Sequence, residues 1–257
     1  MKKKREVYRT SEVARAVGVH PNTVRKYEEW GFLPPVKRES NGYRIYTRFH
    51  MEQMRLARLA FHGGWPGGRI RKSALALVRC SATKDLRKAV RMAKHHIRLV
   101  QEERTQAEAA ADYLERWVRG KAGRGLTAPK TIRAAAEVVD STPDAIRNWE
   151  RNGLLTVPRN PKNGYREYGG PEIGRLRVIR MLLRSGYSTM AVLRAMRRLD
   201  AGGKRLRHTL DTPGPEEDVL WAADHWLSTL SEQEARARKI LAQLRRMERM
   251  QTAGIMD

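Results

Sequence analysis

Apolar residues recur at helical spacing along most of this chain, and two long stretches keep a four-three spacing throughout. The first covers residues 86–118 and the second residues 220–244, and each has a single charged interruption, at Arg104 and at Glu234. This spacing is typical of a coiled-coil seam, in which one face of a helix packs against another helix. The pattern predicts a mainly α protein with two long helices. The opposite charges of Arg104 and Glu234 predict that these helices pair antiparallel, with the two residues close together.

Shorter elements are predicted ahead of each long helix. In the first half, a helix capped by Thr10 or Ser11 is expected to end near residue 17, and a second helix is expected over residues 21–30. Gly31 then ends the second helix as a left-handed cap. The Asn41-Gly42 pair predicts a two-residue hairpin turn, and therefore a small wing, between residues 36–38 and 44–46. Further helices are expected over residues 50–62, 69–79, 171–185 and 189–200.

The second half of the chain repeats the first. Residues 24–33 return as 146–155 and residues 41–46 return as 163–168, both at an offset of 122 without a gap. A register that keeps Gly, Pro and aromatic residues in step indicates a duplication. Asp140 takes the place of Gly18, which predicts a more strained turn in the second copy. The expected domains are 1–82 and 130–211, each followed by a long helix, at 83–119 and 212–257, with a linker at 120–129.

The charge of the chain indicates a nucleic-acid partner. It has 52 Lys and Arg against 28 Asp and Glu, a formal net charge of +24, whereas solubility needs only about 2–8 charges on a small domain. Cations that neutralise phosphates release counterions, which favours binding. Binding to a membrane surface is disfavoured because the cations are spread along the chain instead of lying on one face of a single amphipathic helix. The charged N-terminus and the lack of a long apolar stretch predict a cytoplasmic, nucleoid-associated protein.

Other chemistry finds little support in the sequence. There is no glycine-rich phosphate loop, no metalloprotease motif and no nucleophile motif, so the protein is not expected to be an enzyme. Cys80 is the single cysteine, which excludes an internal disulfide and a cysteine-only metal site. His95 and His96 are expected on a solvated face of the first long helix. We expect no metal and no cofactor.

The segment Thr23-Val24-Arg25-Lys26-Tyr27-Glu28-Glu29-Trp30-Gly31, followed by Asn41-Gly42-Tyr43-Arg44-Ile45-Tyr46, resembles the MerR family of regulators, and the second copy resembles it as well. The resemblance implies winged helix-turn-helix domains with recognition helices in the major groove of double-stranded DNA and wings on the backbone. It also implies antiparallel coiled-coil pairing, and activation by distortion of a promoter, where RNA polymerase would be a further partner.

The resemblance and the residue types together give a set of expected DNA contacts, with short polar and cationic groups on base edges and the wing residues on phosphates. Arg25 and Arg147 have an alternative role as structural partners of Glu28 and Glu150. Because Asp144 replaces Asn22, the two heads are expected to read different sequences. The expected DNA-binding residues are His20, Asn22, Thr23, Arg25, Lys26, Tyr27, Arg38, Tyr43, Arg44 and Tyr46 in the first copy, and Thr142, Asp144, Arg147, Asn148, Trp149, Arg159, Lys162, Tyr165, Arg166 and Tyr168 in the second.

Two questions stay open at this level. One chain carries both heads and both long helices, which favours a single-chain pseudo-dimer over a swapped homodimer with four heads. The alternative function is a small-molecule (drug)-binding resistance or sequestering protein built on a MerR-like body. In that case Trp117, Trp221 and Trp226 would line the cavity, whereas in a regulator they would brace helix against head.

Overall fold

The computed structural model describes residues 7–61, 68–120, 130–213 and 222–256. The chain divides into two compact units, and each takes sequence from both halves. The first unit combines residues 1–101 with residues 232–257, and the second comprises residues 102–231. In the described ranges, no helix is long and apolar enough to cross a membrane.

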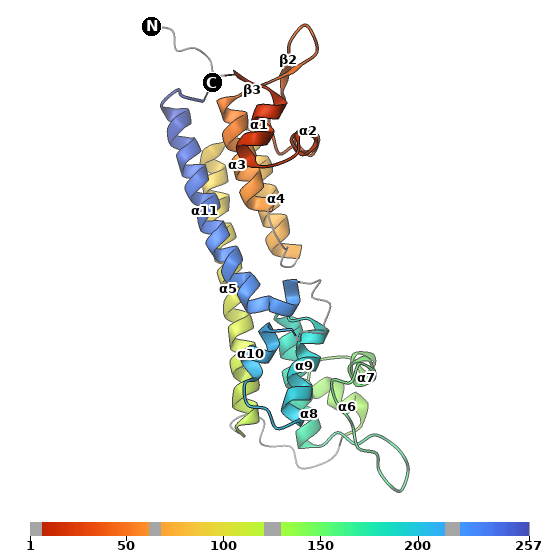
Figure 1. The fold of residues 1–257 in the computed structure, drawn as a ribbon. Helices are drawn as coiled ribbons and strands as arrows, with labels where there is room; N and C mark the ends of the chain where they lie inside the picture. The colour runs from red at the N-terminus through yellow and green to blue at the C-terminus, as the bar shows by residue number, and fades with distance from the viewer. Residues whose placement is uncertain (1–6, 62–67, 121–129, 214–221, 257) are drawn as a thin grey trace. The chain divides into compact units, whose positions relative to one another are not determined.

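The first unit is a small winged head packed on parts of the two long helices (Figure 1). Its sheet has the antiparallel order β1-β3-β2, with Lys37 opposite Ile45 and Val7 opposite Thr47. The strand β1 was not predicted from the sequence. The elements are β1 (Val7–Tyr8), α1 (Thr10–Val17), α2 (Pro21–Glu29), β2 (Lys37–Arg38), β3 (Arg44–Thr47), α3 (Arg48–Phe61), α4 (Gly68–Ala82), the beginning of α5 (Leu86–Val118) and most of α11 (Trp226–Thr252).

Two predicted helix caps are wrong by one or two residues. The N-cap of α1 is Arg9, whose backbone N–H donates to Glu12 Oε2 at 2.6 Å, and not Thr10 or Ser11. At α5 the carboxylate of Asp85 accepts from the backbone N–H of Lys88 at 3.0 Å, so Asp85 caps the helix, which was predicted to begin two residues earlier, at the capping-type residue Thr83. In both places several polar residues precede the apolar pattern, and only the backbone geometry decides which of them caps the helix.

The core of the first unit joins the head to both long helices. Val13, Phe49, Leu77 and Ala89 are buried together with Leu244 of α11. Gln251 Nε2 donates to the Lys84 carbonyl at 3.2 Å, and Gln101 Nε2 donates to Glu234 Oε1 at 2.9 Å. Early residues of α5 therefore lie beside late residues of α11, and the two helices run antiparallel within this unit.

The long helix α5 buries a wider face than the predicted seam. His96 is only 2% exposed, whereas its neighbour His95 is exposed, so the prediction of a solvated face was wrong for His96. Ala89, Ala93 and Val100 are also buried, at helical spacing from His96. The reason is that this part of α5 belongs to a core formed with the head as well as with α11, which needs more than one apolar stripe.

The second unit repeats the head, with isolated β-bridges (Lys130 with Tyr168, Arg159 with Arg166) where the first head has strands. The predicted strain appears at Asp140, where φ is +48°. The Asp140 carboxylate forms an ion pair with Arg180 and lies 3.6 Å from Arg184 Nη1. The elements are the end of α5, α6 (Ile132–Val138), α7 (Pro143–Arg151), α8 (Gly170–Arg184), α9 (Thr189–Asp200), α10 (Leu206–Asp211), the 3₁₀ helix η1 (Ala222–His225) and the beginning of α11.

Two tryptophans brace the second unit. Trp226 Nε1 donates to the Ser185 carbonyl at 2.6 Å, and its ring lies so close to Gly186 that a Cβ there would be 2.5 Å away. A Cβ on Gly174 of α8 would be 2.4 Å from Nε1 of Trp117 in α5. Both side chains therefore pack against glycines instead of lining an open cavity. Trp221, the third tryptophan considered for a ligand cavity, lies outside the described residues.

Candidate nucleic-acid interface

Helix α2 presents one face to the core of the first head and the other to solvent. Val24 is fully buried and Tyr27 is 6% exposed, while Asn22, Arg25 and Lys26 are exposed. The helix begins at His20, whose Nδ1 accepts from the backbone N–H of Asn22 at 3.2 Å. His20 thus caps the helix, a role that the sequence analysis did not foresee. The exposed face carries short polar and cationic side chains. It includes the beginning of the helix, where free backbone N–H groups attract anions.

The wing of the first head has a three-residue loop, not the predicted two-residue turn. Arg38 pairs with Arg44, and Glu39 N–H then donates to the Tyr43 carbonyl at 2.9 Å. The turn closes through a bond of 2.9 Å from Gly42 N–H to the Glu39 carbonyl, with φ of +84° at Gly42. Asn-Gly fits this longer loop because glycine takes the left-handed position that follows the turn.

Arg9 ties the wing to the beginning of α1. Its guanidinium donates to both carboxylate oxygens of Glu39, at 2.6 and 2.9 Å, and lies 5.8 Å from the centre of the Tyr43 ring. The Arg9 hydrogen bonds lower the pKa of the Glu39 carboxyl. No motif marks these two residues in the sequence. Arg9 borders a groove between α1, α2 and the wing, which is lined by Arg9, Thr10, Ser11, Pro21, Arg25, Asn41, Tyr43 and Arg44.

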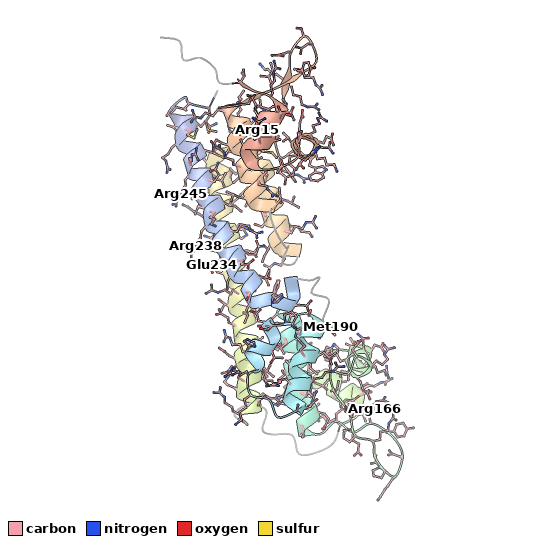
Figure 2. All side chains as sticks on the ribbon, viewed as in Figure 1. Arg15, Arg166, Met190, Glu234, Arg238 and Arg245 are labelled. Atoms are coloured by element: carbon pink, nitrogen blue, oxygen red, sulfur yellow. The ribbon has the colours of Figure 1, made fainter. Side chains whose placement is uncertain are left out.

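One ion pair joins wing to recognition helix in both heads. Arg44 Nε donates to Glu28 Oε2 at 2.7 Å in the first, and Arg166 Nε donates to Glu150 Oε2 at 2.8 Å in the second (Arg166 is labelled in Figure 2). The members of each pair are 16 residues apart and occupy matching positions of the repeat. Glu28 and Glu150 thus pair with the wing arginines, where the sequence analysis had considered Arg25 and Arg147 as their partners.

The second head has the same framework with a different charge pattern. Thr142 caps α7, its Oγ1 accepting from Ala145 N–H at 3.1 Å. Asp144 is highly exposed and accepts from Arg147 Nη1 at 2.6 Å, so a carboxylate and a guanidinium form a pair on the outer face of the helix. The wing of this head has an isolated antiparallel β-bridge between Arg159 and Arg166 instead of paired strands.

Burial divides the expected DNA contacts into three groups. Tyr46 and Tyr168 are fully buried and Tyr27 nearly so, and burial raises the pKa of each hydroxyl. These three tyrosines pack in the cores, and we withdraw them from the expected contacts. Thr23, Arg44, Trp149 and Arg166 are partly buried. The exposed residues are His20, Asn22, Arg25, Lys26, Arg38, Tyr43, Thr142, Asp144, Arg147, Asn148, Arg159, Lys162 and Tyr165.

Comparison with known proteins agrees with this geometry. The family described as "MerR HTH family regulatory protein" matches residues 8–76 and 130–199, together more than half of the chain. The HTH-type transcriptional regulator CueR of Escherichia coli O157:H7 is 40% identical over 55 residues, which are 21% of this chain and 41% of that protein. CueR of Salmonella typhi is 40% identical over 55 residues, 21% of this chain and 40% of its own length. The alignment thus spans about two fifths of these relatives. No solved structure matches the chain.

Proposed function

Because the chain belongs to the MerR family of helix-turn-helix regulatory proteins, we propose that it is a transcription regulator that binds double-stranded promoter DNA with both heads. The observation that carries the proposal is the duplicated tie between wing and recognition helix, Glu28 with Arg44 and Glu150 with Arg166. It fixes the basic wing relative to the recognition helix in each head. Members of this family are regulators and not enzymes, in agreement with the lack of a catalytic motif.

In the proposed complex the outer faces of α2 and α7 enter the major groove. Asn22 and Lys26 are of the kind that reads base edges, while Arg25 and the exposed wing residues reach phosphates. Arg44 and Arg166 hold the wings in place through their glutamate partners. Their contribution to DNA affinity is therefore mainly positional.

The two heads are proposed to read unlike half-sites. Asp144 and Asn148 stand where the first head has Asn22 and Lys26. The bond from Arg147 to Asp144 neutralises much of the acid's charge and holds the guanidinium on the outer face of α7. An arginine held in this way suits the two acceptors of a guanine edge.

We further propose that one chain forms a pseudo-dimer that distorts the promoter before RNA polymerase acts on it. In support, the first head packs on α11, and α5 packs on helices of the second head, so each unit uses a long helix from the other half. Light scattering tests this arrangement: a mass near 29.5 kDa is expected, and twice that value would indicate the swapped homodimer. The packed positions of Trp117 and Trp226 give the drug-sequestering alternative no support.

Selection of bound sequences from random duplex DNA tests the proposed function. The expected result is one asymmetric site with two unlike half-sites. A variant with Asp144→Asn should change the preference in one half-site and leave the other intact. A perfect palindrome would contradict the assignment of unlike heads, and no enrichment would contradict sequence-specific binding altogether.

A further inference from the structure

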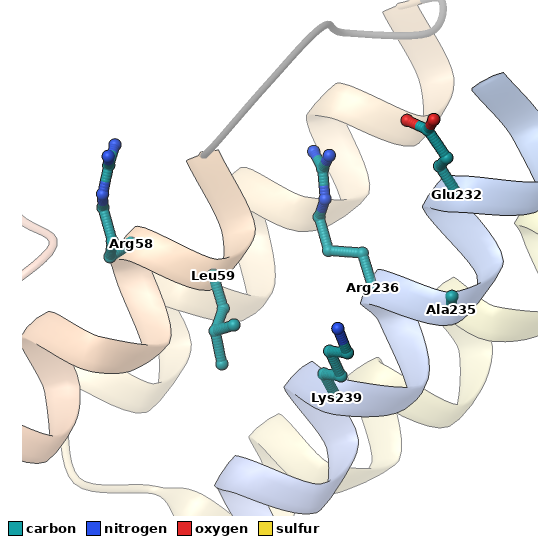
Figure 3. A pocket seen from close by; sticks show the side chains of 6 residues that line it. All are labelled: Arg58, Leu59, Glu232, Ala235, Arg236 and Lys239. Carbon is teal, nitrogen blue, oxygen red and sulfur yellow. The ribbon is translucent and has the colours of Figure 1, made fainter.

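A cavity of about 400 Å³ lies in the first unit, between the end of α3 and the helix α11 (Figure 3). Its volume is in the range of small-molecule sites, about 300–1,000 Å³. Neither Trp117 nor Trp226 is among the described residues that line it. The lining residues are Arg58, Leu59, Glu232, Ala235, Arg236 and Lys239.

Three of the described residues that line the cavity carry positive charge. In Figure 3 the side chains of Arg58, Arg236 and Lys239 extend in the same direction. Within the described ranges, none of these three cations forms an ion pair. Other basic residues of α11 do so: Arg238 pairs with Glu234 at 2.6 Å, and Arg246 pairs with Glu52 at 3.1 Å.

Two of the three cations, Arg58 and Arg236, are partly buried, whereas Lys239 is exposed. Desolvation lowers the pKa of Arg236, and the attraction of Glu232 opposes that shift. An anion bound beside the Arg236 guanidinium would favour its charged form and offset this loss of solvation. The three cations less the one carboxylate leave a formal charge of +2 on the lining.

We propose that this cavity binds a small organic anion, a phosphate or carboxylate carried on an apolar body. The guanidinium groups of Arg58 in α3 and Arg236 in α11 are donors that suit the oxygens of such a group, and the Lys239 ammonium adds a third donor. Leu59 and Ala235 supply the apolar wall for the rest of the ligand. The proposed site is independent of DNA binding.

Calorimetric titration of the full chain with phenyl phosphate, in moderate salt and without DNA, tests the site. Saturable binding of one ligand per chain is expected. The double variant Arg236→Gln with Lys239→Gln should raise the Kd at least about tenfold, because it removes charge-assisted hydrogen bonds to the ligand. Arg58→Gln, on the other wall, should also weaken it, which guards against a folding defect in the α11 variant.

The matched control is Arg245→Gln with Arg249→Gln, which removes the same charge from exposed positions of α11 outside the cavity (Arg245 is labelled in Figure 2). This control should keep the wild-type Kd within about twofold. Inorganic phosphate should bind more weakly than phenyl phosphate, and benzylamine should not bind. The proposal is overturned if phenyl phosphate does not saturate the wild type, or if the control loses as much affinity as the cavity variant. Equal affinity for inorganic phosphate would contradict the apolar wall.

Discussion

Replacing Gly174 with alanine probes the contact between the first long helix and the second head. The new Cβ would lie 2.4 Å from Trp117 Nε1 and 3.2 Å from its Cε2. An ordinary contact distance is about 3.5–4.0 Å, so the indole or the helix α8 must move by roughly 1 Å. Gly174 lies inside α8 and is buried, which leaves little room for that movement.

Two opposing effects set the size of the change. Alanine in a helix is favoured over glycine by about 0.8–1.0 kcal/mol. Overpacking of a well-packed core costs about 1–3 kcal/mol. Because the overlap here is with a rigid aromatic ring, we expect the upper part of that range, and a net loss of about 1–2 kcal/mol.

Urea unfolding of the full chain measures this loss, with Gly68→Ala as the matched control. Gly68 is also helical, and a Cβ there would meet nothing within 4 Å. The control should therefore be neutral or slightly stabilising. In a double-mutant cycle, Trp117→Leu should lower stability alone but relieve most of the cost of Gly174→Ala, because the overlapping ring is gone.

The reasoning fails if Gly174→Ala is as stable as the wild type. It also fails if the two substitutions add without interaction, since that would mean that Trp117 does not lie against α8 in solution.

Three further predictions follow from single residues. Burial lowers the pKa of His96 from 6.5 to about 4, so between these values the unfolded chain binds a proton that the folded chain does not. The free energy of unfolding should therefore fall as the pH drops through this window, by about 2 kcal/mol at pH 5 for this group. In urea unfolding, the free energy of unfolding of His96→Leu should fall by correspondingly less than that of the wild type between pH 7.5 and pH 5. Asp140→Gly should stabilise the second unit by about 0.5–1 kcal/mol, because it relieves the left-handed backbone at the cost of only an exposed ion pair; a lower melting temperature would contradict this. Arg25→Ala should weaken DNA binding on all sequences and reduce the salt slope by about one, whereas Arg245→Ala should leave the slope unchanged; equal slopes for both variants would remove Arg25 from the interface.

The sequence predicts the elements of this fold well because their signals are local. Helical periodicity and the glycine at position 31 depend on neighbouring residues alone, and the ungapped repeat extends the same prediction to the second head. The predicted bounds of the first long helix and of the helix over residues 189–200 agree closely with α5 and α9. The second long helix was predicted over residues 212–257, but α11 begins only at Trp226, after a short 3₁₀ helix, and ends at Thr252. Caps and the wing loop were less predictable, since adjacent polar residues compete and an Asn-Gly pair suits more than one turn length.

The candidate site was predicted in outline and not in its details. Tyr46 and Tyr168 have a polar tip and an aromatic body, which suit a phosphate and a core equally, and only the fold shows them buried. The partners of Glu28 and Glu150 come from the wings, 16 residues away, beyond the reach of helical spacing. The cavity is harder still to predict from the sequence, because Arg58 and Arg236 line it together only when α11 packs on the first head.

Carrying two recognition helices in one polypeptide changes how such a protein can evolve. In a symmetric homodimer every substitution is inherited by both subunits, so a new preference appears at both half-sites at once. Here Asn22 and Asp144 are encoded by separate codons, and either can mutate while the other keeps its target. The glutamate–arginine tie remains in both copies and preserves the shape of each head. Under the proposed function, a tandem chain can thus change the sequence preference of one head at a time while the other head keeps its own.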